Sequence, residues 1–221
     1  METRKFFTDE LARLRQDILT MATMVGENLG KSLTALRTRD SDLADEVRAN
    51  DAQVDALQIK IEDNAAILIA TQQPVARDLR EMVAIFKLTS NIERVGDYSA
   101  HLSRAAKKLS KKADLPFRAQ EHLEKMADIG RVMLNSAISA YMEQDAGAAR
   151  ETAEMDNKID DEHKALTENI LKVIKKDPDM VKSALQILHT SNQLERLGDH
   201  ITNICEAVIY MAEGKREELN E

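Results

Sequence analysis

The sequence is poor in the residues that build strands and tight turns. Its 221 residues include 7 glycines, 3 prolines and no tryptophan, and aromatic side chains make up only 3%. Glycine and proline mark turns, and aromatic and β-branched residues favour strands, so their scarcity argues against a sheet. The chain is 43% hydrophobic and 32% charged, as in folded proteins, and is rich in helix-forming Ala, Leu, Glu, Lys and Arg. We therefore expect an all-α fold.

Long apolar runs are also missing. The run from Ala65 to Ala70 is far shorter than the roughly 20 residues that a membrane-spanning helix needs. Residues Met1 to Lys5 are not followed by the apolar core of a signal peptide, so we expect a cytoplasmic protein with no membrane insertion. The single cysteine, Cys205, cannot form an internal disulfide, and its apolar neighbours Ile204 and Val208 predict a core residue.

Charge and motifs exclude several classes of function. A formal net charge of −8 repels nucleic-acid phosphates, so we expect no nucleic-acid partner. The sequence has no Walker phosphate loop, GxSxG, HExxH, CxxC or dinucleotide fingerprint. A ferritin-like di-metal enzyme would carry Glu-x-x-His on two helices, and that pattern does not occur. The sequence therefore argues against an enzyme.

Capping residues predict six helices. Asp, Ser and Thr favour the position before a helix, and proline favours its first turn. Such signals occur at Thr8, Asp40, Pro74, Asp114 with Pro116, Asp145, and Asp177 with Pro178. They predict helices over residues 8–37, 41–71, 74–110, 116–143, 146–175 and 178–213. The short connections are typical of antiparallel neighbours in a bundle.

The second half of the chain repeats the first. A shift of 102 residues aligns Ile85–Leu102 with Ile187–Ile204, and both segments contain the block ERxGD. A shift of 105 residues aligns the second helix with the fifth. The chain is therefore expected to form two similar three-helix bundles in tandem, over residues 1–113 and 114–221.

Apolar residues recur at steps of three and four along the third and sixth helices, which predicts that one face of each packs into a core. In the third helix these residues are Ile85, Leu88, Ile92, Val95, Leu102 and Leu109. In the sixth they are Ile187, Leu194, Leu197, Ile201, Ile204, Val208 and Met211.

Four pairs of acidic residues have a spacing of four, which puts both carboxylates of a pair on one helix face. The pairs are Asp51 with Asp55, Glu93 with Asp97, Asp156 with Asp160, and Glu195 with Asp199. They lie away from the apolar stripes and are expected to point out of the core. A single pair would be read as a solvated face. Repetition in both halves favours metal sites instead, because like charges at this spacing cost a helix about 0.2–0.5 kcal/mol and a shared cation would offset that cost.

Nearby residues extend the predicted sites. Carboxylate oxygens suit Mg²⁺, Mn²⁺ and iron. His101 and His163 are further candidate ligands, with ordinary surface histidines as the alternative, and Asn203 takes the place of His101 in the second half. Gly96 and Gly198 each cost a helix about 0.8–1 kcal/mol, which indicates close approach of another group to the backbone beside the acids.

On these residues the sequence resembles the PhoU family, regulators of phosphate transport and of the phosphate-starvation response. The resemblance covers nearly the whole chain. It depends on two ExxxD motifs, Glu93–Asp97 and Glu195–Asp199, on the segment QQPVARDLR from Gln72 to Arg80, and on the tandem halves.

The resemblance implies a cytoplasmic, non-enzymatic protein that restrains phosphate uptake. It would link the ATPase subunit of the phosphate ABC transporter to a sensor histidine kinase, and would form a homodimer. It further implies bound Fe, Mn, Mg or Zn at the acidic motifs, held by Glu93, Asp97, Glu195 and Asp199, with Asp51, Asp55, Asp156 and Asp160 as additional ligands. Two alternatives stay open: a metal-storage or redox protein, and a helical adaptor that needs no metal.

Overall fold

The computed structural model describes residues 2–38, 40–109 and 118–220. All regular elements in these ranges are helical, which confirms the all-α prediction. They are α1 (Glu2–Thr38), α2 (Ser41–Gln72), α3 (Arg77–Leu109), α4 (Ala119–Glu143), α5 (Ala146–Ala153), α6 (Asp156–Lys176), the 3₁₀ turn η1 (Pro178–Met180) and α7 (Val181–Glu213).

Two of the predicted helix starts are wrong. Helix α1 begins at Glu2, and Thr8 lies inside it with its hydroxyl donating to the Arg4 carbonyl at 3.0 Å. Helix α3 begins at Arg77 and not at Pro74, because Gln73 and Ala76 have φ angles of 48° and 49° and turn the chain between them. A cap residue marks a helix start only when its neighbours do not already continue a helix.

Three of the predicted aspartate caps are confirmed: Asp40, Asp145, and Asp177, whose carboxylate accepts a hydrogen bond from the Asp179 amide at 3.1 Å at the start of η1. The Asp40 carboxylate accepts hydrogen bonds from the Asp42 and Leu43 amides at 2.9 and 3.1 Å. The Asp145 carboxylate does the same one repeat later, at the start of α5. The predicted cap at Asp114 with Pro116, and the boundary between residues 113 and 114, lie outside the described residues.

The predicted fifth helix is divided into α5 and α6 by a two-residue turn at Glu154 and Met155. The Met155 amide donates to the Thr152 carbonyl at 3.1 Å, which is the tighter i to i−3 bond of a 3₁₀ turn. The turn ends directly before Asp156, so that this predicted site residue becomes the first residue of α6.

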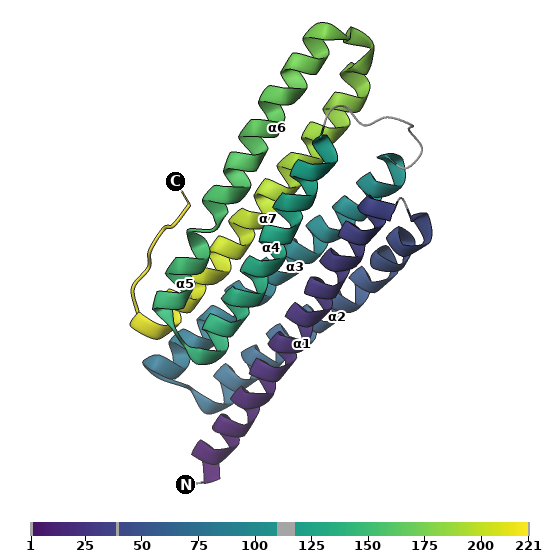
Figure 1. Ribbon diagram of the computed structural model, residues 1–221. Coiled ribbons are helices and arrows are strands. Elements are labelled where there is room, and N and C mark those ends of the chain that lie inside the picture. The colour runs from purple at the N-terminus through teal and green to yellow at the C-terminus, as the bar shows by residue number, and fades with distance from the viewer. Residues whose placement is uncertain (1, 39, 110–117, 221) are drawn as a thin grey trace.

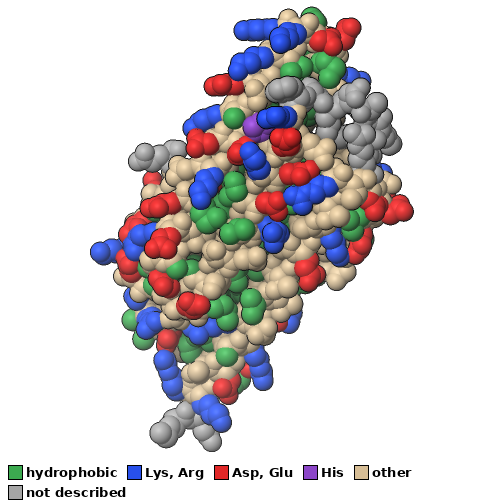
Figure 2. Space-filling view, in the orientation of Figure 1, with side chains coloured by type: hydrophobic (Ala, Val, Ile, Leu, Met, Phe, Trp, Pro, Cys, Tyr) green, Lys and Arg blue, Asp and Glu red, His purple; other side chains and the backbone are tan. Residues whose placement is uncertain are grey.

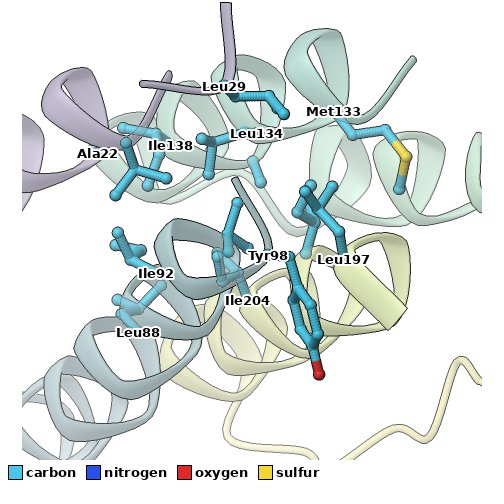
Figure 3. Packing of buried hydrophobic residues seen from close by; sticks show 14 of the residues in the cluster. Ala22, Leu29, Leu88, Ile92, Tyr98, Met133, Leu134, Ile138, Leu197 and Ile204 are labelled. Atoms are coloured by element: carbon cyan, nitrogen blue, oxygen red, sulfur yellow. The ribbon is translucent and has the colours of Figure 1, made fainter. Parts of the chain in front are cut away.

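The two halves share one hydrophobic core. The predicted stripes of α3 and α7 are buried, as is Cys205, while the side chain of Leu109 lies outside the described part. Figure 3 shows residues of both halves in contact: Ala22 of α1 and Ile92 of α3 come from the first, and Leu134 of α4 and Leu197 of α7 from the second. The halves are repeats in sequence but are packed as one body.

The helices run side by side along the long axis of the molecule (Figure 1). Helix α3 packs against α7, and α1 packs against α4, so these four helices join the halves. Helix α2 packs on α3 in one half, as α6 packs on α7 in the other. Figure 2 shows charges of both signs interspersed over the visible face. No helix within the described ranges has the length and hydropathy to span a bilayer.

Candidate metal centres

The structure brings the predicted acids together as two clusters of four. The first cluster joins Asp51 and Asp55 of α2 to Glu93 and Asp97 of α3. Negative charge on Asp51, Asp55 and Asp97 raises the pKa of Glu93, so the four groups lie within electrostatic reach of one another. Burial is the larger cause of that shift. The contact between α2 and α3 therefore brings both pairs together.

The second cluster has the same composition. It joins Asp156 and Asp160 of α6 to Glu195 and Asp199 of α7. Burial first, and then repulsion from neighbouring carboxylates, raises the pKa of Glu195 and of Asp199. The repeat predicted from sequence thus extends to the side-chain clusters.

The acids point less clearly outward than the sequence predicted. Asp55 is exposed, but the other seven are partly buried at the contacts between helices. The Glu93 side chain, for example, is only 20% exposed. A carboxylate that loses part of its hydration is harder to ionise, which is why burial dominates the pKa shifts. The clusters therefore lie at the contacts between helices.

The carboxylates are near one another without being closed around a common point. Within the described ranges, no three His, Cys, Asp or Glu side chains form a group ready to hold an ion. Some of the negative charge is offset by arginine, since Arg94 Nη1 lies 3.1 Å from Asp97 Oδ2.

Among the eight acids of the two clusters, Asp156 has the most strongly raised pKa. Burial, followed by repulsion from Asp160 and Asp199, raises its pKa to about 7. Its Oδ2 accepts a hydrogen bond from Thr202 at 3.3 Å, whereas its buried Oδ1 has no partner. A buried, unpaired carboxylate oxygen is costly, and a hard cation is the partner that such an oxygen favours.

Gly198 explains how Asp156 comes so close to α7. A Cβ at Gly198 would overlap Asp156 Oδ1 and would lie 3.0 Å from Ile159 Cδ1. At Gly96, in the first half, a Cβ would make only ordinary contacts, the nearest with Val25 Cγ2 at 3.4 Å. The predicted close approach to the backbone is thus confirmed at Gly198 and is wrong at Gly96.

The two histidines proposed as extra ligands take part in other hydrogen bonds. His101 Nδ1 is hydrogen-bonded to Gln193 Oε1 of α7 at 2.7 Å, and His163 Nδ1 to Ser191 Oγ at 2.7 Å. Each bond joins two helices and occupies one ring nitrogen. A ligand role for either histidine stays a prediction.

One residue pair at the contact between the halves was missed from the sequence. His200 Nδ1 is hydrogen-bonded to Asn91 Oδ1 at 2.8 Å, and the His200 ring is 5.6 Å from the Tyr98 ring. The shift of 102 residues aligns Asn91 with Gln193, the partner of His101. The two histidines are not themselves aligned, since His200 falls on Tyr98 and His101 on Asn203, so the repeat pointed to the amide partners alone.

Both halves match the family model described as PhoU domain, over residues 18–106 and 123–208. The chain belongs to the PhoU family. Its relatives include a phosphate-specific transport system accessory protein PhoU homolog of Clostridium acetobutylicum, 31% identical over 99% of this chain and 100% of that protein. A homolog with the same description from Pseudomonas putida is 32% identical over 94% of this chain and 81% of that protein.

Solved PhoU structures share the fold. The crystal structure of PhoU from Pseudomonas aeruginosa has a TM-score of 0.90 and 31% identity, covering 95% of this chain and 100% of that one. The regulatory protein PhoU from Streptococcus pneumoniae has a TM-score of 0.89 at 31% identity, covering 96% and 99%. The tandem three-helix architecture predicted from the internal repeat is therefore the PhoU fold.

The raised pKa of Asp156 predicts how the stability of this PhoU protein depends on pH. A folded-state pKa of about 7 lies above the unfolded value of about 3.9, so the unfolded chain releases this proton first. Between about pH 4 and pH 7, ionisation of Asp156 therefore reduces the free energy of unfolding of the metal-free protein, and above that range the loss is complete. Asp156→Asn removes this contribution. We expect the free energy of unfolding of the variant, relative to wild type, to rise by about 2 kcal/mol from pH 4 to pH 8, allowing for partial exposure.

Urea denaturation in the presence of a chelator, repeated across this pH range, measures that difference. Asp63→Asn, at an exposed position on α2, is the control. The difference in free energy of unfolding between this variant and wild type should stay constant across the pH range. A constant difference in free energy of unfolding between Asp156→Asn and wild type would show that Asp156 titrates as an ordinary surface carboxyl.

The two glycines provide a matched test of the clusters. On the prediction that the acids bind metal, Gly198→Ala should displace the Asp156 carboxylate and weaken Mn²⁺ binding at the second cluster by roughly 10- to 100-fold, because positioning of a ligand is lost. Gly96→Ala should leave binding at the first cluster unchanged, because its methyl group fits. Each glycine variant is made in a protein whose other cluster has been neutralised by substitution. Calorimetric titration of these proteins with Mn²⁺ then gives the affinity of each cluster separately. Equal effects of the two substitutions would contradict the packing of Asp156 against Gly198.

Proposed function

We propose that this protein is a cytoplasmic accessory protein of a phosphate-specific transport system, where it restrains uptake and represses the phosphate-starvation response. The observation that carries the proposal is the match to curated PhoU homologs over the full chain, in both PhoU domains. Those homologs are described as accessory proteins of phosphate-specific transport. In this proposal the ATPase subunit of the transporter and a sensor histidine kinase are its partners, and it acts as a homodimer without catalysing a reaction.

The metal sites are a second part of the proposal. We infer that the two clusters hold divalent or transition metal ions, Fe, Mn, Mg or Zn, through the eight carboxylates named above. The unpaired Asp156 Oδ1 and the all-oxygen donor sets support this. A bound cation would supply the positive charge that offsets repulsion among the carboxylates. Asp156 and Asp199 would hold it from opposite helices of the second half, as Asp51 and Asp97 would in the first.

Deletion of the gene tests the regulatory role. In phosphate-rich medium the deletion strain should take up phosphate and express starvation genes several-fold above the parent strain, because the proposed restraint is gone. A plasmid copy of the wild-type gene should restore repression. Unchanged uptake and unchanged gene expression in the deletion strain would refute the proposal. Repression restored equally by a variant that lacks all eight acids would favour the metal-independent adaptor.

A further inference from the structure

The chain reverses direction after α7 and returns along it. Gly214 has a φ of 75°, a left-handed conformation that ends the helix, and its amide donates to the Tyr210 carbonyl at 2.9 Å. Residues 215–220 then continue without regular structure. Figure 1 shows this segment rising beside α5 and ending level with the first turns of α6. We refer to residues 215–220 as the strap.

Arg150 of α5 anchors the first part of the strap. Its guanidinium lies 2.8 Å from Glu213, at the end of α7, and 2.7 Å from Glu217 of the strap. These contacts raise the pKa of Arg150 and lower the pKa of both glutamates, so all three groups stay charged at neutral pH. Two carboxylates on one guanidinium form a network, which holds its geometry better than an isolated surface pair.

The remaining contacts carry the strap to the second acidic cluster. The Leu219 amide donates to Glu206 Oε1 at 2.8 Å, and the Leu219 side chain packs against the core. The Asn220 amide Nδ2 donates to the carbonyl of Asp199 at 3.2 Å. Asp199 is a member of the second cluster, so the end of the strap lies on the α7 backbone at the level of that cluster.

The register of these contacts follows from helix geometry. Asp199, Glu206 and Glu213 are seven residues apart, so they form one stripe along α7. Fourteen helical residues rise about 21 Å, and the six residue steps from Gly214 to Asn220, if extended, reach about 20 Å. The strap is therefore long enough to follow the stripe from Glu213 to Asp199. It spans this length only when it is extended and held at both ends.

We propose that the strap covers one side of the second acidic cluster and controls the exchange of metal ions there, with Arg150 as its latch. The inference rests on the proposed metal binding. Arg150 lies in α5, which ends at the turn that leads into Asp156, so the latch ties together the strap, α5 and α7 around the same cluster. Opening the strap exposes the Asp199 side of the cluster to solvent.

Metal release measures this control. The starting protein carries Asp51→Asn and Asp97→Asn, which leave only the second cluster. It is loaded with Mn²⁺ and mixed rapidly with excess chelator. Arg150→Gln, and separately a chain that ends at Gly214, should release Mn²⁺ roughly three- to tenfold faster, because the strap no longer stays closed. The control Arg13→Gln removes an exposed ion pair with Glu10 on α1 and should not change the rate.

Trypsin cleavage gives a readout that does not involve metal. In the metal-free protein, cleavage after Lys215 and Arg216 should be slow and should become several-fold faster in Arg150→Gln. Equal cleavage would overturn the latch. If Mn²⁺ binds but is released from every variant at the same rate, the strap does not control exchange. The proposed metal sites would still stand. If no variant binds Mn²⁺, the metal sites are refuted, and the control of exchange with them. Faster trypsin cleavage of Arg150→Gln would still identify Arg150 as the anchor of the strap.

Discussion

Replacing the α3 and α7 acids of both clusters together by alanine should abolish the proposed metal binding while the helices persist: Glu93, Asp97, Glu195 and Asp199. This is the expected result, because each cluster then keeps only the two aspartates of its neighbouring helix, too few oxygen ligands for tight binding. Loss of the like-charge pairs should leave the metal-free protein as stable as before or slightly more stable, since each such pair costs about 0.2–0.5 kcal/mol.

Elemental analysis of the purified proteins and circular dichroism measure the two parts of this prediction. The charge-matched control replaces four exposed acids away from the clusters, Asp9, Asp63, Glu151 and Glu168. Both variants carry the same net charge, so a purely long-range electrostatic effect would appear in both. Equal metal content in wild type and in the cluster variant would contradict metal binding at these acids.

Arg15→Met should produce the largest loss of stability of any single substitution considered. The Arg15 guanidinium makes two hydrogen bonds to the Glu81 carboxylate, at 2.6 and 2.8 Å, and the Glu81 side chain is only 4% exposed. Removing the arginine leaves a buried carboxylate without its partner, which costs about 3–5 kcal/mol. Because the pair ties α1 to α3 next to Tyr141 of α4, the loss affects the contact between the halves as well.

Urea denaturation monitored by circular dichroism measures this loss. The double variant Arg15→Met, Glu81→Leu should recover most of it, since no buried charge then remains unpaired. Arg13→Met, on the same helix, removes an ion pair whose arginine side chain is 75% exposed, and should change stability by less than about 0.5 kcal/mol. A loss of similar size for Arg13 and Arg15 would show that the effect belongs to α1 in general and not to the buried pair.

Much of the site was readable from periodicity alone. The spacing of four in Glu93 and Asp97 fixes which helix face carries the acids, and the shift of 102 residues fixes their counterparts Glu195 and Asp199. Neither property depends on how the helices are arranged. The pairing of α2 with α3, and of α6 with α7, which turns four pairs into two clusters, required the fold.

Burial could not be read in the same way. Asp51 and Asp156 align in the repeat, yet only Asp156 has its pKa raised to about 7. Gly198 admits the Asp156 carboxylate to the α7 backbone, whereas the Asp51 carboxylate lies farther from Gly96. The repeat places a glycine at both positions, Gly96 and Gly198. It does not show that a carboxylate packs directly against the backbone only at Gly198.

The sequence by itself determined the helical class, the tandem repeat, the apolar stripes of α3 and α7, and the identity of the acidic residues, because these depend on local propensity and on the periodicity of one helix. The tertiary structure decided the single core shared by both halves, the desolvation of Asp156 and the return of residues 215–220 to Asp199. These depend on contacts between residues far apart in the chain, where the distance between two groups and the water excluded between them set their energies.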